Sequence, residues 1–268
     1  MAIVYSVSTN KGGVGKTSLV TNMAAAIIQT QKKAKVLIVD TDAQGNSAMA
    51  FGKTPIDYEH TIYDVLVKGM SIEQVRVKLM DRLDFVPANK EMNFFVFDVL
   101  LNPKDYPQPL YLLKPAIDAV RDQYDYIFID TPPSLEVVAG NVLLTADRVI
   151  IPFVPETFAV SGIENVIDVI NDFKAEQNPS IVIDGMVGML VDMRTVLHSE
   201  MMVQARKYCA EHGYHLYDTV IPRSVRFAAA TAYDGKPAVL ADQNNPLVAT
   251  YFDLLKEVLK RGKKTLVN

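Results

Sequence analysis

Cysteine is almost absent from this chain, because Cys209 is the only one among its 268 residues. A single thiol forms no internal disulfide and cannot hold an iron–sulfur cluster alone, so both kinds of covalent support are excluded. Cys209 lies in a helix-like stretch, and we interpret it as a packing residue.

Long apolar runs are also missing. No stretch approaches the roughly 20 apolar residues that a membrane-spanning helix needs. The N-terminus is typical of a strand and lacks the charged and apolar regions of a signal peptide. We therefore expect a cytoplasmic protein. The net charge of −4 is small, so any contact with nucleic acid would have to come from a local basic patch.

Hydrophobic residues make up 49% of the chain, which is enough for one large α/β domain with a buried core. Apolar runs typical of buried strands alternate with amphipathic stretches typical of helices. This alternation predicts a doubly wound, mostly parallel sheet flanked by helices, in a single domain over residues 1–268. The expected strands are 3–7, 36–40, 83–87, 126–129, 148–154 and 181–191, and the expected helices are 18–31, 61–68, 72–79, 91–101, 110–122, 163–174 and 246–262.

A glycine-rich loop joins the first expected strand to the first expected helix. Its glycines permit backbone angles and close approaches that a side chain would block, so successive N–H groups can surround a phosphate. Lys16 would add a cation, and the Thr17 hydroxyl would join the shell of a Mg²⁺ ion. The pattern predicts a nucleoside triphosphate site made by Gly12, Gly13, Val14, Gly15, Lys16, Thr17 and Ser18.

The loop departs from the standard G-x-x-x-x-G-K-[ST] pattern, because Asn10 stands at the first glycine and Lys11 follows it. Its KGGVGKT sequence resembles the deviant Walker A loop of the ParA/MinD/nitrogenase-iron-protein group. In that group the early lysine reaches across a nucleotide-sandwich dimer to the partner's phosphates. The resemblance thus implies that Lys11 both binds nucleotide and takes part in catalysis, and that Lys16 is catalytic too. It also implies an ATP-dependent homodimer. The single cysteine excludes nitrogenase-type reductase chemistry.

Two expected strands, VLIVD and YIFID, end in the carboxylates Asp40 and Asp130. Ligands of parallel α/β sheets bind at this edge, although either aspartate could instead cap a helix or turn. Asp130 fits a Walker B residue that holds Mg²⁺ through a water beside Thr17. The sequence DTDAQGNSA resembles the DxDPQGN switch of ParA proteins, with Ala43 in place of proline, and TPPS after Asp130 matches their second switch. We predict Thr17, Asp40 and Asp130 as the metal site, with Asp40 orienting the attacking water.

Residues 219–240 resemble the segment after the last core strand of Soj-like ParA proteins, so the resemblance spans essentially the full length. It implies that Pro222 and Arg223 contact the nucleotide near the adenine. It also implies a partition ATPase with a low basal rate, which moves plasmid or chromosome copies apart. In this family the ATP-bound dimer binds DNA without sequence preference, at the nucleoid, and a ParB-type centromere-binding protein stimulates it. The chain begins at its phosphate loop, so we expect no N-terminal helix-turn-helix domain.

Non-specific DNA binding requires basic residues clustered on one face. We predict Arg194, Arg223 and Arg226 as DNA contacts, and the alternative is that they are ordinary solvated charges.

Two other functions stay open. A MinD-like membrane-surface ATPase would use residues 246–262, where an apolar stripe precedes basic residues that could bind anionic lipid. The same stripe is typical of a last helix packed on the sheet, which is our prediction, so we expect no membrane partner. The third possibility is an ATP-gated scaffold that binds neither DNA nor membrane.

Overall fold

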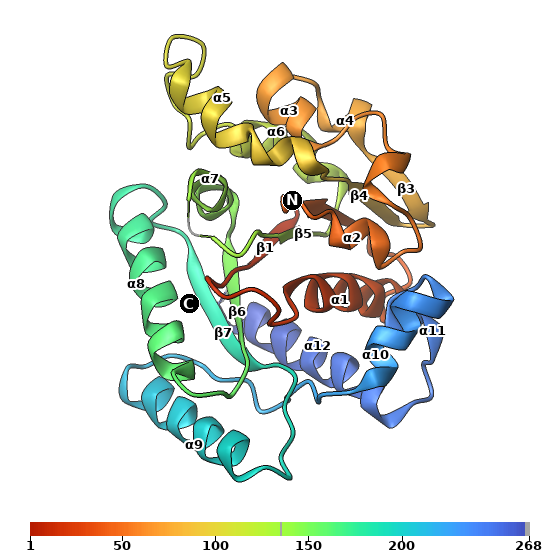
Figure 1. Ribbon diagram of the computed structural model, residues 1–268, viewed down its shortest axis with the longest axis vertical. Helices are drawn as coiled ribbons and strands as arrows, with labels where there is room; N and C mark the ends of the chain where they lie inside the picture. Colours follow the sequence, from red (N-terminus) through yellow and green to blue (C-terminus); the bar gives the residue numbers. More distant parts are fainter. Residues whose placement is uncertain (135, 266–268) are drawn as a thin grey trace.

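The computed structural model describes residues 1–134 and 136–265, and its centre is a seven-stranded sheet (Figure 1). The strand order is β3-β4-β2-β5-β1-β6-β7, and every neighbouring pair is parallel except β3 and β4. The strands are β1 Ile3–Val7, β2 Val36–Asp40, β3 Val77–Met80, β4 Leu83–Val86, β5 Tyr126–Asp130, β6 Arg148–Phe153 and β7 Val182–Gly188. The predicted fold class, a doubly wound and mostly parallel α/β sheet, is confirmed.

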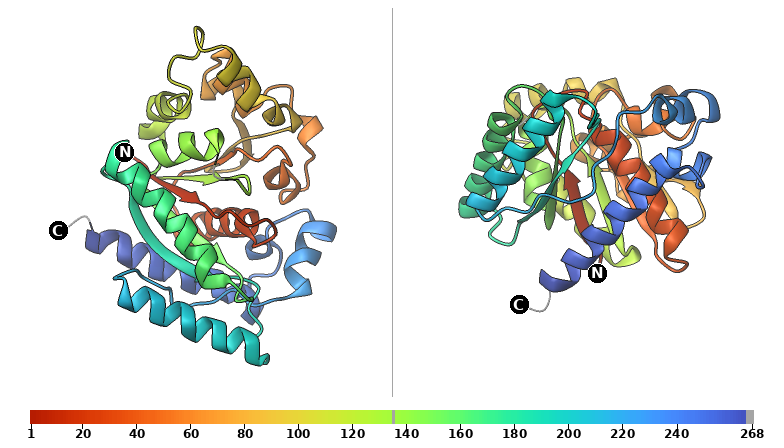
Figure 2. Two further views of the ribbon diagram at one scale, coloured as in Figure 1. Left: turned by 60° about the vertical axis from the view of Figure 1, so that its left-hand side comes forward. Right: turned by 90° about the horizontal axis from the view of Figure 1, so that it is seen from below.

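Helices cover both faces of the sheet (Figures 1 and 2). The long α1 and α12 pack on one face, while α3 to α8 pack on the other. The α-helices are α1 Lys16–Thr30, α2 Asn46–Met49, α3 Ile62–Lys68, α4 Ile72–Val75, α5 Phe95–Leu101, α6 Leu113–Val120, α7 Val137–Thr145, α8 Ala159–Glu176, α9 Val196–Glu211, α10 Val225–Ala229, α11 Ala238–Ala241 and α12 Pro246–Thr265. Shorter turns are η1 Pro55–Asp57, η2 Lys90–Asn93, η3 Arg121–Gln123 and the π-helical η4 Ala230–Asp234.

Both faces of the central strands are apolar, and successive side chains enter different cores. Phe128 in β5 packs into the core beneath α1 and α12, whereas Ile127 and Ile129 pack into the core beneath α3 to α7. This alternation follows from the two-residue repeat of a strand. β2 and β5 are buried on both faces and run parallel, so their last residues lie together at the carboxyl edge of the sheet. Both of these residues are carboxylates.

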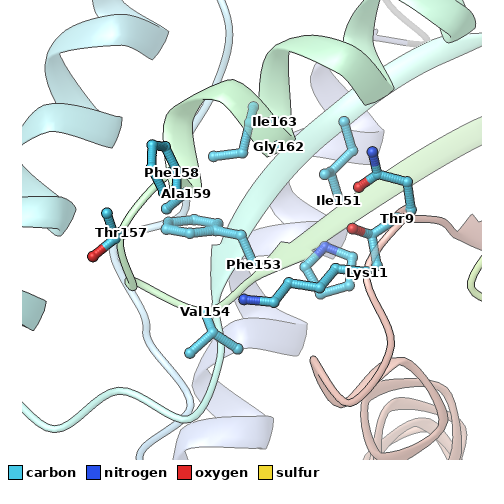
Figure 3. A pocket seen from close by; sticks show the side chains of 12 residues that line it. Thr9, Lys11, Ile151, Phe153, Val154, Thr157, Phe158, Ala159, Gly162 and Ile163 are labelled. Carbon is cyan, nitrogen blue, oxygen red and sulfur yellow. The ribbon is translucent and has the colours of Figure 1, made fainter.

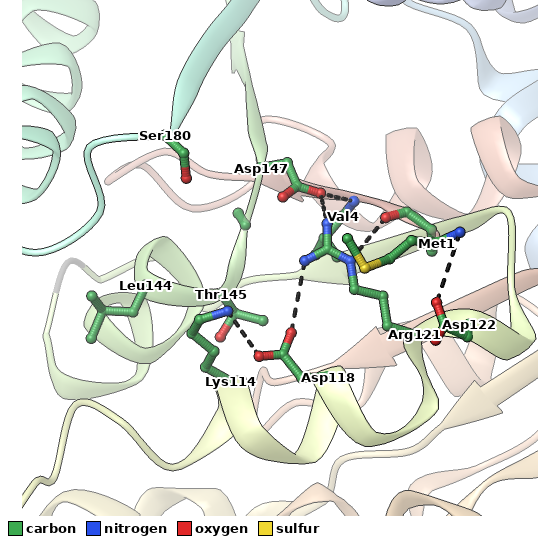
Figure 4. Close-up of polar contacts among 12 residues, drawn as sticks. Met1, Val4, Lys114, Asp118, Arg121, Asp122, Leu144, Thr145, Asp147 and Ser180 are labelled. Atoms are coloured by element: carbon green, nitrogen blue, oxygen red, sulfur yellow. Dashed lines mark hydrogen bonds and ion pairs between the residues drawn. The ribbon is translucent and has the colours of Figure 1, made fainter. Parts of the chain in front are cut away.

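The side chains of Arg121 and Asp147 hold the N-terminal end of β1 (Figure 4). Arg121 forms an ion pair with Asp147, and its Nε donates a hydrogen bond to the Ala2 carbonyl at 3.0 Å. Asp147 Oδ2 also accepts a 2.7 Å hydrogen bond from the Val4 N–H. The start of β1 is therefore fixed at the edge opposite the phosphate loop, which follows the other end of the strand.

The predicted helix over 72–79 is wrong in its second half. Ser71 and Gln74 form a capping box that supports only the short α4. Arg76 then has extended angles, with φ −60° and ψ 141°, and β3 pairs antiparallel with β4. Pairing with β4 makes this segment a strand, because β3 then forms the edge of the sheet beside the largely buried β4.

Other differences concern boundaries and the helices that were not among those expected, which are α2, α7, α9, α10 and α11. The strand expected over 181–191 ends at Gly188, and the helices expected over 91–101 and 110–122 are the shorter α5 and α6. The two longer of the unexpected helices, α7 and α9, lack a clear amphipathic repeat, because α7 is buried almost all round and the apolar residues of α9 do not gather on one face. Cys209 is buried with its Sγ 3.9 Å from Met186 Sδ, so its interpretation as a packing residue is confirmed.

The last helix, α12, packs on the sheet as predicted. The middle of its apolar stripe, with Tyr251, Leu254 and Leu255, is buried in the core shared with α1, whereas Leu247 at its start is 38% exposed. Near the end of the helix, Arg261 Nε donates a 2.5 Å hydrogen bond to the Asp184 carbonyl in β7. The buried part of the stripe is thus occupied by contacts with the protein itself. None of the described helices is both long enough and apolar enough to cross a bilayer.

Two glycines, Gly52 and Gly235, bring distant segments into direct backbone contact. A Cβ atom on Gly52 would lie 3.1 Å from the Gly235 carbonyl oxygen, and a Cβ on Gly235 would lie 3.0 Å from the Gly52 Cα. The turn that follows α2 therefore lies against the turn that precedes α11.

Candidate nucleotide site

The phosphate loop runs from the end of β1 to the start of α1, as predicted. Gly13 and Gly15 have left-handed backbone angles, with φ of 73° and 89°, which a residue with a side chain rarely adopts. Gly15 is the N-cap of α1 and contributes no side-chain cap. The first N–H groups of this 15-residue helix are therefore left for an anion at the loop.

The two lysines of the loop occupy different environments. Lys16 is only 7% exposed, and its Nζ lies 3.4 Å from the Lys11 carbonyl inside the loop. Burial lowers the pKa of Lys16, while the charges of Asp130 and Asp42 raise it. The Lys11 side chain is 57% exposed, and its Nζ bonds Glu156 Oε2 at 2.7 Å. The Lys16 ammonium group thus lies inside the loop, whereas the Lys11 side chain extends outside it.

Asp40 and Asp130 end neighbouring strands and face each other in register. Asp130 Oδ2 accepts hydrogen bonds from Thr17 Oγ1 at 2.7 Å and from Ser47 Oγ at 2.9 Å. Asp40 accepts backbone N–H groups, from Asp42 at 2.9 Å and from Ser47 at 3.2 Å. Asp130 Oδ1 is buried and has no hydrogen-bond partner among the described residues.

Burial has a large effect on these two carboxyl groups. It raises the pKa of Asp130 to about 6, although the Thr17 and Ser47 hydroxyl groups act in the opposite direction. Burial and the charge of Asp130 together hold the pKa of Asp40 well above its usual value. A cation beside two adjacent buried carboxylates would favour the ionised form of both.

These oxygen atoms fit a magnesium ion. The buried Asp130 Oδ1 lacks a partner, and the Thr17 hydroxyl lies beside the same carboxylate. The described residues contain no group of three or more His, Cys, Asp or Glu side chains arranged for a metal. Mg²⁺ suits such a sparse set, because it takes its remaining ligands from phosphate and water. Thr17 and Asp130 would hold the ion, with Asp40 beside them.

The C-terminal loops reach the same edge of the sheet. Val191, which follows β7, forms a backbone bridge with Pro222, and the Arg223 N–H donates to the Val191 carbonyl at 2.9 Å. The Lys11 ammonium lowers the pKa of Glu156, and the charge of Arg223 adds to this effect. Pro222 and Arg223 thus lie on the side of the sheet that carries the phosphate loop. Their contact with the nucleotide stays a prediction.

Two of the three arginines predicted to bind DNA have acidic partners. Arg194 is 90% exposed and holds Asp192 at 2.8 Å, and Arg226 holds Asp242 at 2.7 Å. Arg194 and Arg223 follow the two chain segments that meet at the bridge after β7, whereas Arg226 lies in α10. The bridge thus brings the segments of Arg194 and Arg223 together. The DNA contacts themselves stay predictions.

A hollow of about 290 Å³ lies beside Lys11 (Figure 3). Phe153, Phe158 and Ile163 contribute to its largely apolar lining. Phe158 is 80% exposed and has a left-handed φ of 68°, an unusual angle for a bulky residue.

Sequence reasoning missed two residues of this site. Ser47 contacts both carboxylates, and its only signal is its place inside the DTDAQGNSA segment. Glu156 contacts Lys11 across a separation of 145 residues, so no local pattern could indicate it.

Comparison with known proteins identifies relatives of this chain. Residues 2–183 match a family model described as an AAA domain. The chain is 32% identical to the sporulation initiation inhibitor protein Soj of Bacillus subtilis, over 98% of this chain and 100% of Soj. It is also 32% identical to the chromosome partitioning protein ParA of Caulobacter vibrioides, over 97% of this chain and 95% of that protein.

A solved structure supports the placement of nucleotide and metal in this fold. Cobyrinic acid a,c-diamide synthase from Mycobacterium smegmatis, with bound ATP analogue and magnesium, superposes with a TM-score of 0.83. The identity is 26%, and the match covers 98% of this chain and 96% of the other.

Proposed function

This chain belongs to the ParA/Soj family of P-loop partition ATPases, and from this premise we propose that it hydrolyses ATP and uses an ATP-dependent dimer to bind DNA. In the proposed cycle the dimer binds DNA non-specifically and a ParB-type centromere-binding protein stimulates turnover. The outcome would be segregation of plasmid or chromosome copies in the cytoplasm, at the nucleoid.

One observation supports the ATPase activity most strongly. The phosphate loop, with Lys16 and Thr17, lies next to the paired carboxylates Asp40 and Asp130 at one sheet edge. Hydrolysis needs the γ-phosphate held, its charge neutralised and a water placed in line. Lys16 and the loop N–H groups would hold the phosphates, and Asp40 would orient the water. A bound Mg²⁺ would neutralise charge on the β and γ phosphates.

The proposed dimer places a further demand on Lys11. Its side chain extends outside its own loop and is more than half exposed, so it can reach another molecule. In the proposed dimer it would leave Glu156 and contact the partner subunit's phosphates. A cation delivered in this way adds transition-state stabilisation only when two ATP-bound subunits meet. Turnover would therefore depend on dimerisation.

The packing of α12 favours DNA over a membrane as the surface that the dimer binds. Lipid insertion would need the apolar stripe of this helix, but Tyr251, Leu254 and Leu255 are already buried against the sheet. Exposing them would cost several kcal/mol, because each large side chain contributes roughly 1.5–3 kcal/mol when it is buried. Arg194 and Arg223 need no such rearrangement to meet phosphates.

The test is binding to a random-sequence DNA duplex with ATP, with ADP and without nucleotide. Dimer formation is followed by light scattering in the same samples. We expect DNA binding only with ATP, together with a doubled mass, and neither in Lys16→Ala. Binding to anionic liposomes in place of DNA would favour the membrane function. An ATP-dependent dimer that binds neither surface would favour the scaffold. No ATP-dependent dimer at all would overturn the proposal.

A further inference from the structure

Ser47 connects the two carboxylates of the site. Its side chain is fully buried, and its Oγ donates a 2.9 Å hydrogen bond to Asp130 Oδ2. Its backbone N–H donates a 3.2 Å bond to Asp40 Oδ2. Among the described residues, Ser47 is the one that donates hydrogen bonds to both carboxylates. Neither the phosphate loop nor the metal pattern in the sequence includes it.

The local fold fixes Ser47 in this place. Gly45 precedes α2 with a left-handed φ of 62°, and a Cβ there would lie 2.9 Å from the Ala88 carbonyl and 2.4 Å from Pro55. The turn is thus held between the end of β2 and two neighbouring segments. Ser47 follows in the first turn of α2, so its hydroxyl faces β5 while its N–H faces β2.

The hydroxyl of Ser47 differs in duty from that of Thr17. Both donate to the same oxygen, Asp130 Oδ2. Thr17 is also the expected metal ligand, so its hydroxyl would serve the ion as well. Ser47 has no such second duty and can hold Asp130 with or without the ion. With Oδ2 occupied, the buried Oδ1 is the oxygen that is left to face the metal shell.

We propose that Ser47 is a positioning residue for Mg²⁺, which orients Asp130 and ties the segment after β2 to it. The proposal rests on the proposed nucleotide function and adds a residue to it. Without the hydroxyl, Asp130 keeps only the Thr17 bond and turns more freely. Binding of the ion then has to order the carboxylate as well, so the ion binds less tightly. Nucleotide binding without the ion does not use this contact.

The experiment measures the affinity of a fluorescent ADP as a function of Mg²⁺ concentration, starting in EDTA. ADP avoids turnover and dimerisation, so the readout is independent of activity. In Ser47→Ala we expect the Mg²⁺ midpoint to rise about tenfold, the change that loss of one hydrogen bond to a charged group produces. The ADP affinity in EDTA should stay within twofold of the wild type.

Three further variants separate positioning from packing. Ser47→Cys keeps the volume with a weak donor, so its midpoint should also rise. Ser47→Thr keeps the hydroxyl and should restore a midpoint near the wild type. Thr145→Val removes another buried hydroxyl, which bonds the Asn141 carbonyl at 2.7 Å in α7, and should leave the midpoint unchanged.

Two results would overturn this role for Ser47. One is a midpoint within twofold of the wild type in both Ser47→Ala and Ser47→Cys. The other is an equal loss of ADP affinity with and without Mg²⁺, which would indicate a structural role only. A wild-type protein whose ADP binding ignores Mg²⁺ would overturn the metal site of the proposed function as well.

Discussion

The Lys11 ammonium nitrogen lies 2.7 Å from a carboxylate oxygen of Glu156, although 145 residues separate them in the chain. Both side chains are partly exposed, at 57% and 43%, so the pair contributes at most about 1 kcal/mol. The proposed dimer needs Lys11 at the partner subunit's phosphates, so this pair must break as the dimer forms. Glu156 therefore competes with dimerisation.

Glu156→Gln should strengthen the ATP-dependent dimer by up to about fivefold, because the ion pair no longer holds Lys11. Sedimentation equilibrium with a non-hydrolysable ATP analogue measures the change. Glu176→Gln, which removes an exposed charge at the far end of α8, is the matched control. Weaker dimerisation of Glu156→Gln would show that Glu156 supports the interface.

Lys16→Ala should weaken nucleotide binding and abolish both ATP-dependent dimerisation and turnover, because it removes the cation inside the phosphate loop. Lys11→Ala is the informative comparison. Its monomer should still bind nucleotide, since Lys11 lies outside its own loop, but its turnover should be lost. Nucleotide titration and light scattering distinguish the two. A Lys16→Ala protein that dimerises with ATP would refute the assigned role of the loop.

Asp40→Ala should lower the rate of hydrolysis by about a hundredfold or more, as expected for a residue that orients the water. ATP binding should change far less, because the phosphate loop is intact, and the ATP-bound dimer should persist. Single-turnover hydrolysis and ATP titration of the same sample give both values. Turnover near the wild-type rate would transfer the catalytic role to another group, such as the segment after Asp130.

Asp130 should make the nucleotide-free protein less stable as pH rises. Burial raises the pKa of Asp130 to about 6 from 3.8, so between these values the folded state holds a proton that the unfolded chain releases. The free energy of unfolding therefore falls with rising pH through this window. Asp130→Asn should be more stable than the wild type at pH 7.5, by roughly 1–3 kcal/mol.

Urea denaturation at several pH values measures this difference, which should vanish near pH 4. Asp172→Asn, at an exposed position in α8, should show no such trend. A less stable Asp130→Asn protein at pH 7.5 would mean that the hydrogen bonds from Thr17 and Ser47 outweigh the cost of burial.

Arg194→Ala and Arg223→Ala should each weaken DNA binding while the ATP-dependent dimer persists. If each arginine contacts a phosphate, its loss should flatten the slope of log affinity against log salt by roughly one unit. Lys78→Ala, which removes an exposed charge from β3 at one outer edge of the sheet, should leave the slope unchanged. Unchanged slopes in both arginine variants would place the DNA contacts elsewhere.

Contiguous motifs carried most of what the sequence could predict. The runs that end in Asp40 and Asp130 are buried on both faces, so each predicted both a strand and the edge at which its carboxylate lies. Features that depend on partners far along the chain were missed. β3 is a strand because β4 lies beside it, and the contact between Glu156 and Lys11 exists only once β1 and β6 are paired.

Gly52 and Gly235 are two positions at which the fold tolerates few substitutions. A methyl group added at either position would lie closer to the other glycine's backbone than an ordinary van der Waals contact. Any other residue would be strained at the left-handed φ of these positions, 69° and 58°, and would push against the opposite turn. A random library selected for a functional protein should therefore return glycine at both positions. Because each glycine is required by the backbone of the other, we expect the two positions to stay glycine together in related sequences.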